Sequence, residues 1–216
     1  MYKMRDFDFS MSSPEGQILV EFVESLKPKR TLEVGCNYGK ELRQINKLTE
    51  IYGLDNSKKQ IKRAKKYLPS GNFIFGEGEK TPFPDEHFDL VYTAGCLSHN
   101  PPKKLPLLLD ELIRVSKKYV LLIEYIGSKT GMTSIGNPKT NTWIHDYEKF
   151  CATKDVTFCL NRDRRIGTDI YKTILLRKNN NDGVVKEYVK LYPREDKELL
   201  HLNLWKFNFK IMKKEK

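Results

Sequence analysis

The stretch LEVGCNYGK, residues 32–40, contains the turn that decides the fold. It follows a short β-prone segment, residues 30–34, and leads into residues 40–48, where Leu42 and Leu48 belong to an apolar side at helical spacing. A strand, a glycine-containing turn and a helix in this order are typical of the first unit of an α/β sheet.

The same alternation of strands and helices recurs along the chain. Further strands are predicted at 51–55, 72–78, 88–95, 119–125, 156–161 and 169–178, and helices at 14–26, 57–68, 104–118 and 143–151. The segment 119–125, YVLLIEY, is almost entirely apolar, as is typical of a central strand that is covered on both faces. The pattern predicts an α/β fold with a doubly wound, mostly parallel sheet of seven strands and helices on both faces.

The repeated units indicate one domain, which we expect to span residues 1–178. Residues 126–142 are rich in Gly, Ser, Thr and Asn, so they are predicted to form a long loop, of a length that is usually functional or mobile in a compact domain. KNNNDG, at 178–183, has the composition of a linker. Residues 179–216 are predicted to be a C-terminal extension, and their role does not follow from the sequence.

Composition narrows the class of protein. The chain has 216 residues, 39% of them hydrophobic, and no apolar run long enough for a membrane span. The first residues lack the apolar core of a secretory signal, so we expect a cytoplasmic protein with no membrane partner. The four cysteines form no C-x-x-C pair, and we expect no metal site. A net charge of +11 favours anionic partners.

The glycine turn is a candidate cofactor site because ligands of open α/β sheets bind beyond the carboxyl ends of the strands. Gly35 and Gly39 allow a sharp turn and a close approach of backbone to ligand. A dinucleotide turn has the pattern G-x-G-x-x-G, whereas this turn has G-x-x-x-G preceded by Glu33, an acid that would repel a phosphate. The alternative is an ordinary tight turn between a strand and a helix.

Two further acids follow predicted strands. Asp55 ends the second strand, where a carboxylate can accept hydrogen bonds from both hydroxyls of a ribose. Glu77 ends the third strand, near the place where a base would lie. These residues predict a ligand with a ribose, a base and a positive centre, and without a phosphate.

Three stretches resemble the motifs of class I S-adenosylmethionine-dependent methyltransferases, in the right order over roughly residues 30–125. They are Glu33-x-Gly35-Cys-Asn37-Tyr-Gly39, then YGLDNS, then GEGEKTPFPDEHFDLVYTAGCLSH. The resemblance implies the class I methyltransferase fold with its Rossmann-like sheet, and S-adenosyl-L-methionine as cofactor. It assigns cofactor binding to Glu33, Gly35, Cys36, Asn37, Gly39, Asp55, Asn56, Glu77, Gly78 and Gly95.

The chain departs from the family in two places. Asn37 stands where the family commonly has glycine, and SKKY replaces the usual K-P-G-G turn before the fifth strand. The combination of GCNYG, TAGCLSHNPPKKL, SKKYVLLIEY and a following W-x-x-D is similar to the small methylases associated with pseudaminic acid and other surface-sugar biosynthesis.

Candidates for the acceptor side follow the fourth and fifth strands. A methyl group leaves a sulfonium by in-line displacement, so the protein has to align the acceptor and, where needed, remove its proton. A histidine suits that second task because its usual pKa is near neutrality. The predicted catalytic residues are His99 and His145, and the predicted acceptor-binding residues are Glu124, Tyr125, Trp143 and Asp146. The alternatives are a helix cap or a cofactor contact for His99, and structural anchors for Trp143 and Asp146.

We therefore expect an enzyme that methylates a hydroxyl or amine of a small, anionic metabolite, a nucleotide-linked sugar, whose phosphates the positive charge would hold. An RNA methyltransferase that docks its substrate on the basic surface is the alternative. A methyltransferase-like scaffold without cofactor is a further one, which the intact acids Glu33, Asp55 and Glu77 disfavour.

Overall fold

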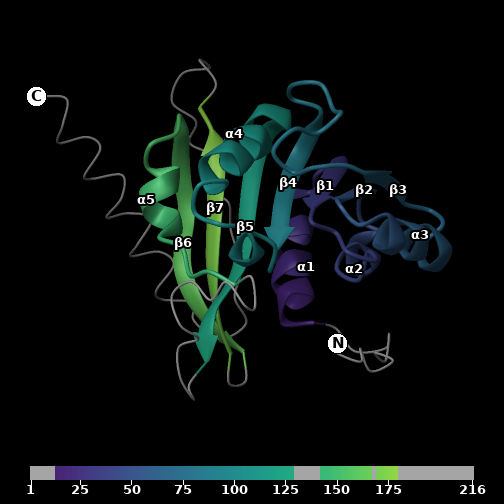
Figure 1. The fold of residues 1–216 in the computed structure, drawn as a ribbon, viewed down its shortest axis with the longest axis horizontal. Coiled ribbons are helices and arrows are strands. Elements are labelled where there is room, and N and C mark those ends of the chain that lie inside the picture. Colours follow the sequence, from purple (N-terminus) through teal and green to yellow (C-terminus); the bar gives the residue numbers. More distant parts are fainter. Residues whose placement is uncertain (1–12, 129–141, 167–168, 180–216) are drawn as a thin grey trace, which may run out of the picture.

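A computed structural model describes residues 13–128, 142–166 and 169–179, and these residues contain one seven-stranded sheet. Its order is β3-β2-β1-β4-β5-β7-β6, which Figure 1 shows from right to left. The strands are β1 (Arg30–Val34), β2 (Glu50–Asp55), β3 (Asn72–Phe75), β4 (Phe88–Ala94), β5 (Ser116–Ser128), β6 (Val156–Ile166) and β7 (Asp169–Lys178). Strands β1 to β5 pair in parallel, and β7 lies antiparallel between β5 and β6. The predicted doubly wound, mostly parallel sheet is confirmed.

The order of the strands reverses beside β1. This strand pairs with β2 on one side and with β4 on the other, through Glu33↔Gly53 and Glu33↔Tyr92. The chain therefore leaves the carboxyl ends of β1 and β4 in opposite directions, and the crevice that such a switch opens is where ligands of open α/β sheets bind.

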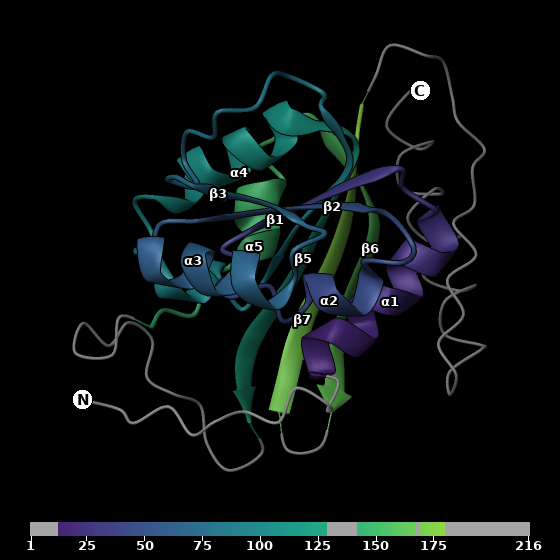
Figure 2. The ribbon, with the colours of Figure 1, turned by 90° about the vertical axis from the view of Figure 1, so that its right-hand side faces the viewer.

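The sheet separates two hydrophobic cores. The helices α1 (Pro14–Leu26), α2 (Leu42–Ile45) and α3 (Lys58–Tyr67) cover one face, and α4 (Leu105–Val115) with α5 (Tyr147–Cys151) covers the other. Figure 2 shows α4 on the opposite side of the sheet from α1, α2 and α3. Successive residues of a strand serve the two cores in turn, so Leu121 packs toward α1–α3 and Leu122 toward α4.

The helix starts follow the polar residues that precede them. Ser13 caps α1 by accepting a hydrogen bond from Gly16 N at 3.0 Å, and Pro14 occupies the first turn. Ser57 caps α3 by accepting one from Gln60 N at 3.4 Å. These caps set the first residue of each helix, which is Pro14 as predicted in α1 and Lys58, one residue later than predicted, in α3.

Several predicted boundaries were wrong. The helix predicted over 40–48 is a single turn, α2, and Leu48 is 46% exposed instead of facing the core. The helix predicted over 104–118 ends at Val115, because the next residues pair with β4 through Phe88↔Ser116 and Leu90↔Tyr119. Strand pairing thus overrides the helical propensity of these residues.

The last strands are longer than predicted because they pair with one another. Strand β5 runs to Ser128 and β6 runs to Ile166. Each of these two residues lies opposite Asp169 of β7. Within the described ranges, no helix has the length and apolar character needed to cross a membrane. The rest of the predicted loop at 126–142 and nearly all of the extension at 179–216 lie outside the described residues, so the domain boundary stays a prediction.

Candidate functional site

The glycine turn has the left-handed backbone that its sequence requires. The φ angles of Gly35, Asn37 and Gly39 are 81°, 50° and 81°. Asparagine is one of the few side chains that adopt this region readily, so the turn keeps its conformation with Asn37 in place of a glycine. The amides of Gly35 and Cys36 both donate to Leu54 O, at 2.8 and 3.0 Å, which ties the turn to β2.

Asp55 is held by the backbone on both sides of its carboxylate. Its Oδ2 atom accepts a hydrogen bond from Asn37 N at 2.8 Å, and its Oδ1 atom accepts one from Ser57 N at 2.8 Å. The side chain is half-buried at the carboxyl end of β2. Each carboxylate oxygen has a second lone pair, so the group can still accept from a vicinal diol. Its position beside the glycine turn fits the predicted ribose contact.

Polar side chains and glycines follow the carboxyl ends of β2, β3 and β4. Asn56 Nδ2 donates to Glu77 Oε2 at 3.4 Å, and both side chains are exposed. Gly95, which follows β4, has φ 62°, and a Cβ atom there would meet nothing within 4 Å. Gly78 is different, because a Cβ atom there would come within 2.8 Å of Leu108 Cδ2 in α4. Gly95 therefore borders open space, whereas Gly78 lies closely against the side chain of Leu108.

Glu33 is buried instead of exposed to a ligand. Its side chain is 1% exposed on the α1–α3 side, and Oε2 has no hydrogen-bond partner among the described residues. Burial raises its pKa well above the ordinary value, and the nearby charge of Glu41 raises it further. The buried acid has capacity for one more donor, and its direct contact with a cofactor stays a prediction.

Two thiols join the turns after β1 and β4. Cys36 is fully buried and Cys96 is half-buried, and burial raises the pKa of both. A Cβ atom on Gly35 would overlap Cys96 Sγ, so the two turns lie in direct contact. These thiols are packing groups within the site.

Glu124, a predicted acceptor-binding residue, is buried and bonded within the protein. The side chain is 0% exposed, and Oε1 accepts from Thr93 Oγ1 at 2.8 Å. Oε2 accepts from the amides of Leu97 and Ser98, at 3.1 and 3.3 Å. The carboxylate is therefore occupied in holding the turn after β4. Burial raises its pKa to about 7, against the lowering effect of these hydrogen bonds.

His145 holds the same turn from its carbonyl side. Its Nε2 atom lies 3.1 Å from Leu97 O and 2.9 Å from Asn100 O, so this nitrogen carries the proton and donates. The ring is 7% exposed, and burial lowers its pKa, which favours the neutral form. Nε2 is thus unavailable as a base. The predicted catalytic role of His145 as a base could therefore use only Nδ1.

The remaining predicted residues are placed as follows. His99 is exposed at the end of the short helix η1 (Leu97–His99), beyond β4, so its predicted role as a base stays open. Tyr125 is half-buried and meets the ring of Tyr171 edge-on at 6.0 Å. Asp146 caps α5 by accepting from Lys149 N at 3.0 Å. Trp143 N donates to Ser98 O at 2.7 Å, which places its backbone beside the turn after β4.

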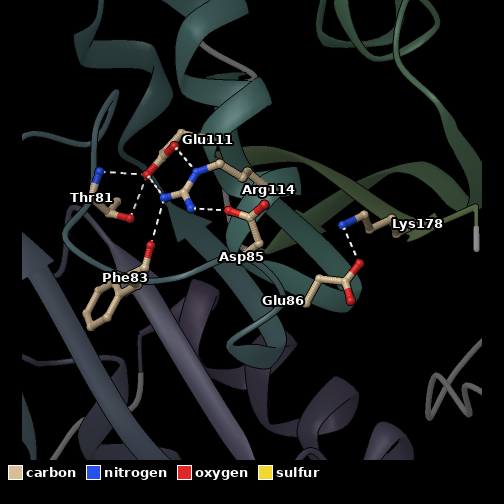
Figure 3. Close-up of polar contacts among 7 residues, drawn as sticks. All are labelled: Thr81, Phe83, Asp85, Glu86, Glu111, Arg114 and Lys178. Atoms are coloured by element: carbon tan, nitrogen blue, oxygen red, sulfur yellow. Dashed lines mark hydrogen bonds and ion pairs between the residues drawn. The ribbon is translucent and has the colours of Figure 1, made fainter.

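One polar network, between α4 and the loop that precedes β4, was missed by the sequence reasoning (Figure 3). Arg114 in α4 donates from Nε to Glu111 Oε2 at 2.8 Å and from Nη2 to Phe83 O at 2.9 Å, and it pairs with Asp85. Glu111 Oε1 accepts from both the amide and the hydroxyl of Thr81, at 2.6 Å each. The network fixes the loop between β3 and β4 on α4. The one available signal was the spacing of Glu111 and Arg114 on a helix.

In the described ranges, no group of three or more His, Cys, Asp or Glu side chains is arranged to hold a metal ion. The strand order, the left-handed glycine turn and the oriented Asp55 define the class I methyltransferase fold, whose usual cofactor is S-adenosyl-L-methionine. Asp55 and the open space at Gly95 fit such a cofactor.

Known proteins agree with this class. Residues 31–119 match the family described as "Methyltransferase domain". Demethylmenaquinone methyltransferase of Thermotoga maritima is 31% identical over 93 residues, which are 42% of this chain and 41% of that protein. Sterol 24-C-methyltransferase erg-4 of Neurospora crassa is 38% identical over 99 residues, which are 42% of this chain and 26% of that protein.

A solved structure has the same fold. The magnesium protoporphyrin IX methyltransferase of Synechocystis PCC 6803, crystallised with S-adenosylmethionine, has a TM-score of 0.58 at 12% identity, covering 76% of this chain and 80% of that one. The chain thus spans less than half the length of the two curated relatives, and its residues 31–119 are similar to a methyltransferase domain.

Proposed function

We propose that this protein transfers a methyl group from S-adenosyl-L-methionine to a hydroxyl or amine of a small, anionic metabolite, a nucleotide-linked sugar. The observation that carries the proposal is the geometry of Asp55. Two backbone amides fix its carboxylate beside the glycine turn, at 2.8 Å each. A carboxylate held in this way is pre-organised for a ribose diol, so it loses little side-chain entropy on binding.

The chain's own residues would divide the work of binding and alignment. Asp55 would accept from the ribose, and the turn with Gly35 and Gly39 would lie along the amino-acid part of the cofactor. The cofactor would supply a methyl group on a positively charged sulfur. The open space at Gly95 would admit the part of the cofactor that carries this methyl group, and His99, on the same turn, would take the acceptor's proton.

An anionic acceptor is supported by charge. The net charge is +11, and five lysines on α3 are exposed, namely Lys58, Lys59, Lys62, Lys65 and Lys66. None of the five forms an ion pair within the described part of the chain, so their charge is available to a partner. The choice of a nucleotide-linked sugar rests on the sequence resemblance, since the names of the matched relatives refer to unrelated acceptors, demethylmenaquinone and a sterol.

The same lysines favour RNA as the second candidate acceptor. They lie on one ten-residue helix that contains no acid, and a row of cations is what a phosphate backbone requires. RNA binding would depend on several of these lysines of α3, whereas binding of a small metabolite would use few of them.

Calorimetric titration with S-adenosylhomocysteine tests the cofactor site, with NAD as the comparison ligand. We expect binding of the first ligand alone, weakened by about 1–3 kcal/mol in Asp55→Asn. Asp89→Asn is the matched control. Asp89 is also half-buried and also accepts from two backbone amides, Lys29 N and Arg30 N, at 2.9 and 3.0 Å, but it lies at the opposite end of the sheet. Absence of binding to the folded protein would contradict the proposal, and so would equal losses in the two variants.

Transfer of a radioactive methyl group to a panel of nucleotide-linked sugars and to RNA then separates the acceptors. The double variant Lys59→Glu, Lys62→Glu distinguishes them further, because these two residues are exposed on α3. We expect methylation of a nucleotide-linked sugar, with little change in this variant. Labelling of RNA alone, lost in the variant, would establish the second candidate instead.

A further inference from the structure

The turn after β4, residues 95–100, is hydrogen-bonded to two neighbouring segments at once. We propose that Glu124 and His145 are positioning residues for methyl transfer, which fix this turn and with it the candidate base His99 against the cofactor-binding turn. The inference rests on the proposed function, and it assigns to two buried side chains a role in aligning the acceptor side of the site.

Glu124 holds the amide side of the turn. Its two oxygens accept from Cys96 N at 3.4 Å, Leu97 N at 3.1 Å and Ser98 N at 3.3 Å, as well as from Thr93 Oγ1 at 2.8 Å. These are the first amides of η1, which have no partner within the helix itself. An ionised carboxylate accepts hydrogen bonds and donates none, so its two oxygens match a group of converging N–H donors. An amide or hydroxyl side chain has one acceptor oxygen and could not satisfy these donors as fully.

His145 and Trp143 hold the carbonyl side. His145 Nε2 donates to Leu97 O at 3.1 Å and to Asn100 O at 2.9 Å, and Trp143 N donates to Ser98 O at 2.7 Å. Leu97 is therefore bound through its amide by β5 and through its carbonyl by the segment before α5. Donors and acceptors of the turn are satisfied by two parts of the chain that are distant in sequence.

The fixed turn is also in contact with the cofactor-binding turn. Cys96 leaves no room for a Cβ atom on Gly35, and Gly95 N donates to Ile123 O at 2.9 Å. Between these two anchors the backbone of Gly95 borders open space. A shift of the turn would therefore change the shape of this space and the position of His99 together.

The chemistry of the two side chains indicates more than packing. Glu124 lies within β5 on the same face as the apolar residues Leu122 and Ile126, and burying an acid there costs free energy that a leucine in its place would avoid. Bonds to the turn and to Thr93 offset this cost. We infer that the two side chains fix the geometry of the turn at the expense of stability.

Hydrogen–deuterium exchange of the whole protein tests the inference, with and without S-adenosylhomocysteine. In Glu124→Gln we expect the peptide covering 95–100 to exchange about tenfold faster or more. Peptides from α1 and α3 should be unchanged, and the affinity for S-adenosylhomocysteine should be retained. In the wild type the ligand should slow exchange of the turn further, and in the variant this protection should be lost.

Two further sets of variants keep the test decisive. His145→Phe removes the donor and should loosen the turn in the same way, whereas His145→Gln keeps an N–H near the position of Nε2 and should restore its protection. Glu111→Gln is the matched control, because Glu111 is also a buried acid that accepts from a backbone amide, Thr81 N at 2.6 Å. It should speed exchange near residue 81 and leave 95–100 unchanged.

Each outcome is informative. Unchanged exchange at 95–100 in both Glu124→Gln and His145→Phe would overturn the inference, and so would a ligand that protects the turn equally in wild type and variants. If Glu124→Gln does not fold, the pair of His145 variants decides. If the wild type does not bind S-adenosylhomocysteine, the proposed function fails, and the role in aligning methyl transfer fails with it, even if the exchange data show that the turn is held.

Discussion

Gly35 and Cys96 lie in direct contact although they follow different strands, because a Cβ atom on Gly35 would overlap Cys96 Sγ and would lie 2.8 Å from Cys96 Cβ. Gly35 also has φ 81°, a backbone conformation that other residues adopt at a cost. The cofactor-binding turn and the turn after β4 therefore meet without space for a side chain.

This contact predicts a large effect of Gly35→Ala. The variant combines left-handed strain with a clash against a buried neighbour, so we expect a loss of about 2–4 kcal/mol in the free energy of unfolding, measured in urea. Gly95→Ala is the control. Gly95 has φ 62° but open space around the missing Cβ, so it should lose only the backbone contribution of about 1 kcal/mol. Equal losses would show that the Gly35–Cys96 contact does not restrict the turn.

The raised pKa of Glu124 predicts a dependence of stability on pH. Its pKa is about 7 in the folded protein against an ordinary 4.5, so folding favours the protonated form. The stabilisation is complete below pH 4.5 and is lost as the pH rises through 7, by about 3 kcal/mol at most. Glutamine does not titrate, so the variant Glu124→Gln lacks this pH dependence. The unfolding free energy of the wild type should therefore fall relative to that of the variant as the pH rises over this range.

Urea unfolding at a series of pH values from 4.5 to 8 measures this difference. The titratable neighbours of Glu124 are Cys96 and Tyr147, and burial raises the pKa of both, so they stay neutral in this range. Parallel curves for wild type and variant would contradict a raised pKa of Glu124.

The network of Arg114 predicts that its geometry matters more than its charge. Arg114→Lys keeps the charge but cannot reach Glu111, Phe83 O and Asp85 together, so we expect a loss of about 1–2 kcal/mol in thermal or urea unfolding. The ion pair of Lys178 with Glu86, at 2.8 Å, provides the comparison because it is a single contact to an exposed carboxylate (Figure 3). Lys178→Ala should cost about 0–1 kcal/mol. A larger loss at Lys178 than at Arg114 would contradict the importance of the network.

The thiols are predicted to be unreactive in the folded protein. Burial raises the pKa of Cys36, Cys96 and Cys159, and it raises that of Cys151 to about 12. Because the thiolate is the reactive form, iodoacetamide at pH 8 should label the native protein slowly and the urea-unfolded protein at all four positions. Rapid labelling of native Cys96, followed by mass spectrometry, would show that the turn after β4 opens readily.

The fold could be predicted from the sequence to a large extent, because it depends on local patterns. Short β-prone or apolar segments identify the seven strands, apolar residues at helical spacing identify most helices, and serine and proline mark the start of α1. Gly35, Asn37 and Gly39 indicate a left-handed turn by residue type alone, and Asp55 follows a strand at the position of a ribose acceptor. Each of these signals lies within a few residues of the feature that it predicts.

The roles of Glu124 and His145 were decided only by the tertiary structure. Both were predicted to line the acceptor side, and both instead bind the backbone of a turn that is more than twenty residues away in sequence. The end of α4 at Val115 was set by pairing of the next residues with β4, and the loop bonded to Arg114 was set by the packing of α4. Hydrogen bonds between distant segments depend on the path of the whole chain, whereas helix spacing, turn conformation and caps are properties of the local sequence.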